Sequence, residues 1–386
     1  MTNTIQRIID LAIQIQQIPA PTFDEGRRAE FMRALFLQEG LQDVSVDETG
    51  NVYGRWTVDG GRRTEAKPLI VSAHMDTVFP LDMDLIVRRE EGKVFGIGIG
   101  DNSLGVAALV GLLWMLRERV LSPGLSPSPQ PSPEGRGGLV GDIWFVANTC
   151  EEGLGDLRGM KTVVERFGSD VLMYLVLEGM ALGHVYHKAV GVKRYRITAR
   201  TQGGHSWSDY GQPSAVLELA RLIGELSALR LPLRPRTTMN VGRVNGGTSI
   251  NVIPAEAWME LDLRSEGVGE LAELVAGVEM LIESANRPGV RFEAEVIGAR
   301  PAGEMSPRHP LVKLAQKCLR DQGLDAVLTS GSTDANVPLS KGYPALVLGV
   351  SNGGGAHTKN EFIETEPVGK GMEQLVRFVS SVVSES

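Results

Sequence analysis

Histidine and carboxylate side chains stand at or just after the ends of the most apolar runs of the sequence. The set comprises His74 and Asp76 after PLIVSA, Glu151 and Glu152 after DIWFVANTC, Glu178 at the end of VLMYLVL, and His357 after PALVLGVSNGGGA. A further carboxylate, Asp101, follows the glycine-rich GIGIG and precedes a helix-like stretch. Histidine and carboxylate ligands without cysteine suit zinc, and also cobalt or manganese. The pattern therefore indicates a metal site.

The apolar runs that precede these side chains are typical of buried strands. PLIVSAH at 68–74 is apolar enough to be covered on both faces, as the strands of parallel sheets are. Helix-like stretches at 103–120 and 157–168 alternate with such runs, which predicts an α/β sheet with helices on its faces. Ligands of open α/β sheets bind beyond the carboxyl ends of the strands. We therefore expect the candidate ligands to converge at that edge.

The spacing of the acidic residues predicts a division of roles. Asp76 lies two residues after His74, where it can accept a hydrogen bond from the imidazole and fix its tautomer. Successive side chains at the end of a strand point in different directions. Glu152 can therefore face a cation that compensates its charge, while Glu151 faces a water molecule and acts as a general base.

Several of these residues have a structural alternative. His74 could be a satisfied core histidine, and Asp101 could cap the helix that follows it. GIGIG invites a dinucleotide-binding interpretation, but it lacks the full glycine fingerprint after a strand. Glu178 would be a costly buried acid if it had no partner, which favours ligation. Cys150 is expected to be a small buried residue rather than a ligand or a catalytic group.

The composition excludes several classes of protein. The chain has 386 residues, of which 42% are hydrophobic and 22% charged, as in a globular protein of about two domains. A formal net charge of -8 argues against binding to nucleic acid. No window reaches the roughly 18 apolar residues of a membrane span, and the amphipathic N-terminal stretch lacks the apolar core of a signal peptide. With only two cysteines, a reduced cytoplasmic setting is expected.

The pattern of apolar and polar residues changes from about residue 189. KRYRITARTQ and AWMELDLRS alternate like half-exposed antiparallel strands, and helix-like stretches lie at 213–229 and 268–286. Patterns of buried strands and helices then resume with HPLVKLAQKCLRDQG and PALVLGV. This order predicts an α+β domain inserted into the α/β domain.

We expect the α/β domain to comprise residues 1–188 and 297–386, with a mixed sheet and helices on both faces. The inserted domain would comprise residues 189–296, with a four-stranded antiparallel sheet and two helices. LSPGLSPSPQPSPEGRGG at 121–138 is too rich in proline, serine and glycine for a packed core and predicts a flexible insertion. A proline-rich ligand for a partner domain is the alternative interpretation of that segment.

Five segments resemble a known family. SAHMDTV, GIGDNSLGVAA, TCEEGLGDLRGM, GGHS and GGGAHTKNEF are similar to the dinuclear metallopeptidase family of glutamate carboxypeptidase, aminoacylase, succinyl-diaminopimelate desuccinylase and tripeptidase T. The resemblance extends from IPAPT to AHTKNEF and leaves out only the insertion. GSTDANVPLSKGYPALVLG is most similar to the tripeptidase-like branch, although tripeptidases resembling that branch tend to carry Asp where this chain has Glu178.

The resemblance implies two divalent ions per subunit, zinc in the first place and cobalt or manganese as alternatives. The implied ligands are His74, Asp101 and Glu178 for one ion, and Asp101, Glu152 and His357 for the other, with Asp101 bridging. Asp76 would orient His74. Glu151 would act as the general base for a metal-activated bridging water and later as the proton donor.

The inserted domain resembles the family's lid, which also forms the dimer. The resemblance implies that His205 in GGHS reaches the partner subunit's active site and stabilises an oxyanion; a surface histidine is the alternative. Asn251 and Arg264 match lid positions that contact the substrate's carboxylate or the transition state, although Arg264 could instead pair with a neighbouring acid. Gly354 would let a substrate carboxylate approach the backbone near His357.

The expected function is metal-dependent hydrolysis of a peptide or amide bond. The substrate would be a small peptide or an N-acyl amino acid with a free carboxylate, and the enzyme a cytoplasmic homodimer formed through residues 189–296. Hydrolysis of N-carbamoyl or N-acetyl amino acids on the same site is the alternative reaction. A non-catalytic metal- or peptide-binding homologue is the alternative class, against which the intact Glu151 argues. Aminopeptidase, carboxypeptidase and deacylase specificity all remain open.

Overall fold

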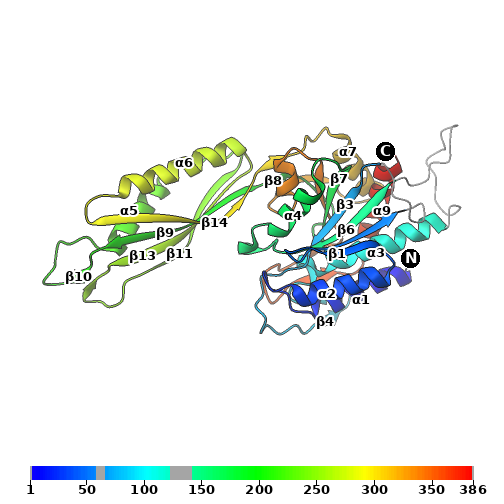
Figure 1. The fold of residues 1–386 in the computed structure, drawn as a ribbon, viewed down its shortest axis with the longest axis horizontal. Coiled ribbons are helices and arrows are strands. Elements are labelled where there is room, and N and C mark those ends of the chain that lie inside the picture. The colour runs from blue at the N-terminus through cyan, green and yellow to red at the C-terminus, as the bar shows by residue number, and fades with distance from the viewer. Residues whose placement is uncertain (1, 58–65, 122–140, 385–386) are drawn as a thin grey trace. The chain divides into compact units, whose positions relative to one another are not determined.

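The computed structural model describes residues 2–57, 66–121 and 141–384 (Figure 1). The chain forms two compact units, the first built from Met1–His187 with Glu304–Ser386 and the second from Lys188–Gly303. The predicted insertion at 121–138 lies, apart from Leu121, outside the described residues.

The first unit is built on a nine-stranded mixed sheet with the order β1-β2-β6-β3-β7-β17-β8-β15, and β16 pairs with β8. Its parallel centre consists of β3 (Leu69–His74), β6 (Asp142–Asn148), β7 (Met173–Glu178) and β17 (Ala345–Gly349). The flanking strands are β1 (Gln42–Val46), β2 (Val52–Thr57), β8 (His184–Ala189), β15 (Gly303–Glu304) and β16 (Val327–Gly331). Every residue of β3, β6 and β17 is buried, as their apolar runs predict.

A smaller antiparallel sheet completes the strands of this unit. Its order is β18-β19-β5-β4, formed by β18 (Gly353–Gly354), β19 (Phe362–Glu364), β5 (Lys93–Phe95) and β4 (Arg88–Glu90). Pairing of Phe362 with Phe95 brings two segments that are distant in sequence side by side.

Helices cover both faces of the large sheet. They are α1 (Thr2–Gln16), α2 (Gly26–Gln38), α3 (Leu104–Leu121), α4 (Arg158–Phe167), α7 (Pro310–Arg320), α8 (Asn336–Ser340) and α9 (Val368–Ser384). The ring of Tyr53 lies 6.2 Å from that of Phe167 on α4, whereas a side chain at Gly54 would meet Phe36 of α2. Because neighbouring strand residues point to opposite faces, α2 and α4 cover opposite faces, and the predicted mixed α/β architecture is confirmed.

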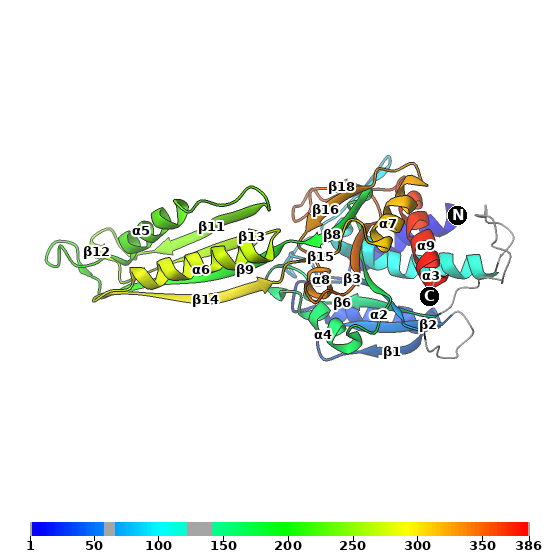
Figure 2. The ribbon, with the colours of Figure 1, turned by 90° about the horizontal axis from the view of Figure 1, so that it is seen from above.

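Helix α3 occupies the core of the first unit. The stretch Ile99–Val120 is long and apolar enough to cross a membrane, yet 94% of its most apolar 18-residue window is buried within the fold. The helix contacts β3, β6 and β7, and α1 and α9 contact it in turn. Figure 2 shows α3 beside α9. Packing in the core therefore accounts for its apolar composition.

The second unit is an antiparallel sheet covered by two helices. The sheet has the order β11-β13-β9-β14, from β11 (Thr237–Gly246), β13 (Glu256–Ser265), β9 (Gly191–Thr201) and β14 (Val290–Arg300). Helices α5 (Ala215–Ser227) and α6 (Val268–Ala285) contact each other and pack on the same strands. Alternate residues of β13 are buried beneath them, so the α+β pattern predicted for this region is confirmed.

Glu218 on α5 supplies a prediction about stability. It is 4% exposed, and its carboxylate lies 2.5 Å from the guanidinium of Arg221 and 2.5 Å from that of Arg287. Burial would raise the pKa of Glu218, but the hydrogen bonds from Arg287 and Arg221 outweigh it and lower that pKa. A carboxylate whose pKa is lowered by folding stabilises the folded protein at pH values above its unfolded pKa, roughly 4.3. This stabilisation is lost as the pH falls through the pKa of the folded state.

We therefore expect Glu218→Gln to lower the free energy of unfolding by about 1 kcal/mol at pH 7, since both arginines are largely exposed. The difference from the parent should shrink progressively below about pH 4. Urea unfolding at both pH values measures this. An undiminished difference in acid would show that the charge of Glu218 is not its cause.

Candidate metal centre

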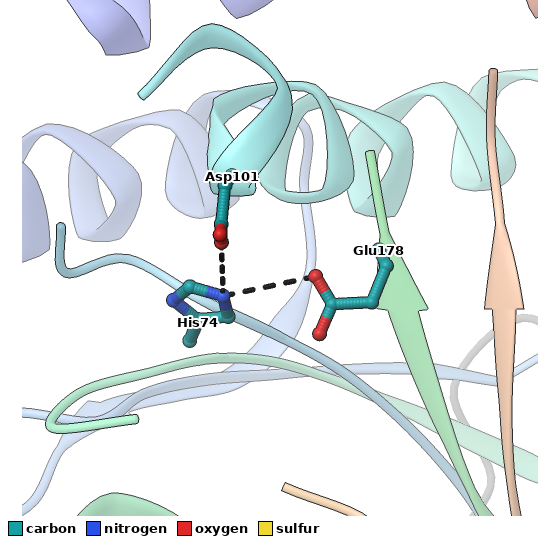
Figure 3. Close-up of side chains that lie close together, drawn as sticks. All are labelled: His74, Asp101 and Glu178. Atoms are coloured by element: carbon teal, nitrogen blue, oxygen red, sulfur yellow. Dashed lines mark ion pairs between the residues drawn. The ribbon is translucent and has the colours of Figure 1, made fainter. Parts of the chain in front are cut away.

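Asp101 lies between two histidines in the first unit. Its Oδ1 is 3.2 Å from Nε2 of His74, and its Oδ2 is 3.1 Å from Nε2 of His357. His74 ends β3, and Asp101 lies in the kinked turn Ile99–Ser103 that leads into α3, where its own backbone is not helical (φ -118°, ψ 83°) (Figure 3). The two carboxylate oxygens thus face different imidazoles, which is the arrangement that a bridging ligand requires.

Two further carboxylates complete two groups of donors. Oε2 of Glu178, at the end of β7, is 3.7 Å from Nε2 of His74. Oε1 of Glu152 is 3.1 Å from Nε2 of His357. In each trio, His74 with Asp101 and Glu178, and Asp101 with Glu152 and His357, the donor atoms lie within 4.8 Å of one another. A third such group joins His74 to Glu151 and Glu152.

Asp76 organises the segment that carries the two glutamates. Its Oδ1 and Oδ2 accept hydrogen bonds of 2.9 Å from the backbone N–H groups of Glu151 and Glu152. The hydroxyl of Thr22 donates to Oδ2 at 2.9 Å. On its other side, Oδ1 is 3.5 Å from Nδ1 of His74, whose closer neighbour is the backbone oxygen of Asp76 at 3.2 Å. Asp76 therefore holds His74 and the glutamate pair in one hydrogen-bond network.

Electrostatics favours a cation at this place. Burial alone would lower the pKa of His74, but hydrogen bonds to the surrounding carboxylates outweigh it and raise that pKa well above its usual value. Hydrogen bonds to Asp101 and Glu152 raise the pKa of His357 to about 10. The pKa of Asp101 is lowered, because the two histidines outweigh the effect of burial. The negative potential that stabilises a proton on each imidazole would also stabilise a divalent cation.

The match to a protein family decides the identity. A model of the peptidase family M20/M25/M40 matches residues 70–381 of the chain, a stretch that contains every residue of these donor groups. The chain belongs to this family. It is accordingly a hydrolase that acts on peptide or acyl-amino-acid bonds with the help of metal ions. The family membership expected from the motifs is confirmed.

Relatives include both deacylases and peptidases. Acetylornithine deacetylase from Erwinia tasmaniensis is 32% identical over 368 residues, covering 84% of this chain and 88% of that protein. Succinyl-diaminopimelate desuccinylase from Corynebacterium glutamicum is 24% identical over 374 residues, covering 94% of this chain and 91% of that protein. The crystal structure of a tripeptidase from Staphylococcus aureus has the same fold, with a TM-score of 0.79, 22% identity and 98% of each chain covered.

The donor set in this M20/M25/M40 member fits divalent metal ions. Two imidazoles and three carboxylates are the side chains that zinc, cobalt and manganese accept. Asp101 offers one oxygen toward each imidazole, and no cysteine is among the donors of the described groups. The five sequence-predicted ligands thus lie together, with Asp76 and Glu151 beside them.

The structural alternatives for single residues can be compared with these contacts. Asp101 does not cap a helix; its carboxylate faces the two histidines, and α3 begins at Leu104. The amides of Gly98 and Gly100 in GIGIG donate to the carboxylate of Glu361, as the amide of Asp101 does, so they are engaged within the fold. Cys150 is 3% exposed, and burial raises the pKa of its thiol to about 12, which agrees with a buried structural residue.

Two amides beneath the centre were missed by the sequence reasoning. The side chain of Asn102 donates from Nδ2 to the backbone oxygen of Leu177 at 2.9 Å and accepts from the N–H of Gly179 at 2.8 Å, so it brackets Glu178. Asn148, opposite His74 in the β3–β6 register, donates to the carboxylate of Asp334 at 2.7 Å. In the sequence they were marked only by their place in the motifs GDN and NTCEE.

Two buried acids were also missed. Asp334 and Glu361 are both 0% exposed, and burial raises the pKa of each to about 7. Asp334 stands in GSTDAN and Glu361 in AHTKNEF, two segments that carried the family resemblance. Their burial was the missing signal, since an acid in a motif of a loop looks the same in sequence whether it is exposed or enclosed.

The remaining predicted residues have local contacts of their own. In the second unit, His205 on β10 (Gly204–His205) pairs with Val252 of β12 (Val252–Ile253), and the backbone oxygen of Asn251 accepts from Ser206 at 3.1 Å. Nε of Arg264 is 2.6 Å from Oδ2 of Asp262, the pairing with a neighbouring acid that was the alternative for it. In the first unit, Gly354 pairs with Phe362 across β18 and β19, close in sequence to His357.

Proposed function

We propose that the protein hydrolyses the amide bond of a small peptide or an N-acyl amino acid through a centre of two divalent ions. The main support for this proposal is the position of Asp101, whose two carboxylate oxygens face His74 and His357 in two adjoining donor groups. His74, Asp101 and Glu178 would hold one ion, and Asp101, Glu152 and His357 the other. Zinc is the proposed ion, with cobalt or manganese able to replace it, because all three accept imidazole and carboxylate ligands.

Glu151 is proposed as the general base and acid. When bound, the ions would polarise the scissile carbonyl and make the attacking water more acidic. Glu151 takes a proton from that water as its oxygen attacks the carbonyl carbon. It returns the proton to the nitrogen as the carbon–nitrogen bond breaks, so an acid and an amine leave and the carboxylate is regenerated. Asp76 contributes by fixing the backbone of Glu151 through a 2.9 Å hydrogen bond.

His205 is proposed to stabilise the oxyanion formed in this attack. Its Nδ1 lies 3.2 Å from the backbone nitrogen of Trp207 and 3.3 Å from that of Ser208, both of which donate to it. An Nδ1 that accepts two N–H groups leaves the ring proton on Nε2, which becomes a donor suited to a developing negative charge. We further propose that His205 acts in the active site of the partner subunit.

Asn251, Arg264 and Gly354 are each proposed to take part in binding the substrate's free carboxylate. Asn251 and Arg264 supply an amide and a guanidinium, and Gly354 leaves room for an anion to reach the backbone beside His357. Ser249 donates to Oδ1 of Asn251 at 2.8 Å, which orients that amide. Arg264 would exchange its contact with Asp262 for the substrate, since its side chain is 43% exposed.

The domain roles follow from this proposal. Residues 1–188 and 297–386 would form the catalytic domain and residues 189–296 the lid and dimerisation domain. In support of dimerisation, β11 is an edge strand with exposed residues along most of its length, and Val216, Ile223 and Val244 line a hollow of about 400 Å³ between it and α5. An exposed edge strand is a template for antiparallel pairing with a second copy.

Sedimentation equilibrium tests the dimer. We expect the parent to sediment as a homodimer at micromolar concentration and Val244→Glu, at a position that is 58% exposed, to shift it toward the monomer. A charge buried in a paired edge would cost several kcal/mol, whereas on a free surface it would cost little. A parent that is monomeric throughout would contradict the proposal.

The cytoplasm is the proposed location, since both cysteines are free thiols.

A substrate panel tests the function itself. The purified protein, loaded with zinc, cobalt or manganese, is assayed on a dipeptide, a tripeptide, N-acetyl amino acids and N-carbamoyl amino acids. We expect turnover of at least one class, abolished by a chelator and restored by the ion. The 32% identity to an acetylornithine deacetylase favours N-acyl amino acids as the second candidate. Absence of turnover from all classes with metal bound would favour a non-catalytic binding protein.

A further inference from the structure

Glu361 joins two segments that are far apart in the sequence. Its carboxylate is fully enclosed, with 0% exposure of the residue. Oε2 accepts a hydrogen bond from the N–H of Gly98 at 3.0 Å, and Oε1 accepts from those of Gly100 and Asp101 at 2.8 Å each. Glu361 stands 260 positions after Asp101. A single side chain therefore accepts hydrogen bonds from three backbone amides of the loop that ends at the bridging carboxylate.

The segment that carries Glu361 also carries His357. Both lie in the connection between β18 and β19, where His357 itself has a left-handed backbone (φ 63°). The backbone oxygen of Glu361 accepts from the N–H of Gly96 at 3.0 Å, so the main chain of the two segments is joined as well. Nε2 of His357 then lies 3.1 Å from Oδ2 of Asp101.

The chemistry of this contact favours a carboxylate over other groups. Burial raises the pKa of Glu361 to about 7, and the hydrogen bonds from the three backbone amides oppose that rise, because both carboxylate oxygens accept from them. Glutamine has the same shape but offers only one acceptor oxygen. Its NH2 group would face at least one backbone N–H, which leaves two donors opposed to each other in a buried place.

We propose that Glu361 is a positioning residue for the metal centre, which fixes the loop of Asp101 against the loop of His357. It does not touch the ions; it acts through the backbone of both ligand loops. The inference rests on the proposed function, because it requires that Asp101, Glu152 and His357 hold an ion. We therefore expect the affinity for the ion of Asp101, Glu152 and His357 to depend on Glu361. The affinity for the ion of His74, Asp101 and Glu178 should depend on it less.

The test is the affinity of metal-free protein for zinc and cobalt ions. We expect Glu361→Gln to bind the ion held by Asp101, Glu152 and His357 about 10- to 100-fold less tightly than the parent, in competition with a chromophoric chelator. The absorption of cobalt in the visible range should change for one ion and persist for the other. Glu366→Gln is the matched control, because Glu366 is an exposed residue that follows β19 in the chain. It should bind both ions like the parent.

Thermal unfolding separates positioning from a general loss of stability. A residue that only supports the fold would lower the melting temperature equally with and without metal. Glu361→Gln should instead reduce the rise in melting temperature that zinc produces in the parent. Two ions bound with parental affinity in Glu361→Gln would overturn the inference and leave the proposed function standing. A parent that binds no ion would overturn both.

Hydrogen exchange tests the same contact in the unmodified protein, should the variant not fold. The amides of Gly98, Gly100 and Asp101 should exchange as slowly as those of the buried strand β3 in metal-free parent, because each donates to an enclosed carboxylate. Exchange of these three amides at the rate of an open loop would show that Glu361 does not hold them, and would overturn the inference.

Discussion

Glu151→Gln is expected to lower kcat by about 10²- to 10⁴-fold while the bound metal stays the same. The residue is 6% exposed, and its backbone N–H is held by Asp76 at 2.9 Å, so an isosteric amide should occupy the same place. An amide cannot take a proton from water near neutral pH. Steady-state kinetics on the best substrate of the panel, together with metal analysis of the same sample, measures both quantities.

Glu165→Gln is the matched control. Glu165 is an exposed residue of the nearby helix α4, so this substitution makes the same chemical change on the surface. It should leave kcat and metal content unchanged. Full turnover in Glu151→Gln would contradict its role as a base. Loss of turnover together with loss of an ion would instead make Glu151 a ligand, because it also forms a donor group with His74 and Glu152.

Asp101→Asn is expected to weaken the binding of both ions and to lower kcat/KM by about 10³-fold or more at limiting metal. Asp101 is shared by the group that contains Glu178 and the group that contains His357. Asparagine keeps one oxygen and loses the charge, so one of the two ions would face an NH2 group, which cannot act as a ligand. Metal-assisted polarisation is worth several kcal/mol, and each 1.36 kcal/mol is about tenfold in rate.

The comparison that isolates bridging is His357→Ala, which removes a donor from one group only. It should release one ion and retain the other, whereas Asp101→Asn should weaken both. Asp321→Asn, at an exposed residue that pairs with Lys317 at 2.6 Å, controls for the loss of a surface charge. Parental affinity for two ions in Asp101→Asn would remove the bridging assignment. Equilibrium dialysis against zinc gives the stoichiometry in each case.

The candidate ligands could be found in the sequence because they follow a general rule of sheet geometry. Apolar runs end at His74 and Glu178 and lead to Glu152 and His357, and parallel strands bring their carboxyl ends to one edge. The alternation of AWMELDLRS likewise predicted a half-exposed strand, and alternate residues of β13 are buried. In both cases the chemistry of the side chain and the period of the strand carry the information locally.

Glu361 and Asn102 could not be found in this way. Their partners are backbone amides and carbonyls, which every residue has, so nothing in the residue types marks the contact. The partners of Glu361 come about 260 positions earlier in the chain. The turn at Asp101 is similar, because the helical pattern from residue 103 offered a cap as the alternative role for Asp101, whereas its backbone is not helical and its carboxylate lies beside two histidines.

Side-chain chemistry and periodicity in the sequence thus name the donors, the strands that end at them and the α+β insertion. Tertiary structure alone gives each histidine one oxygen of Asp101 and encloses Glu361 beneath the loop. The physical reason is that hydrogen bonds depend on directions and distances of a few ångströms. Those distances are set by packing between segments hundreds of residues apart, which no local pattern records.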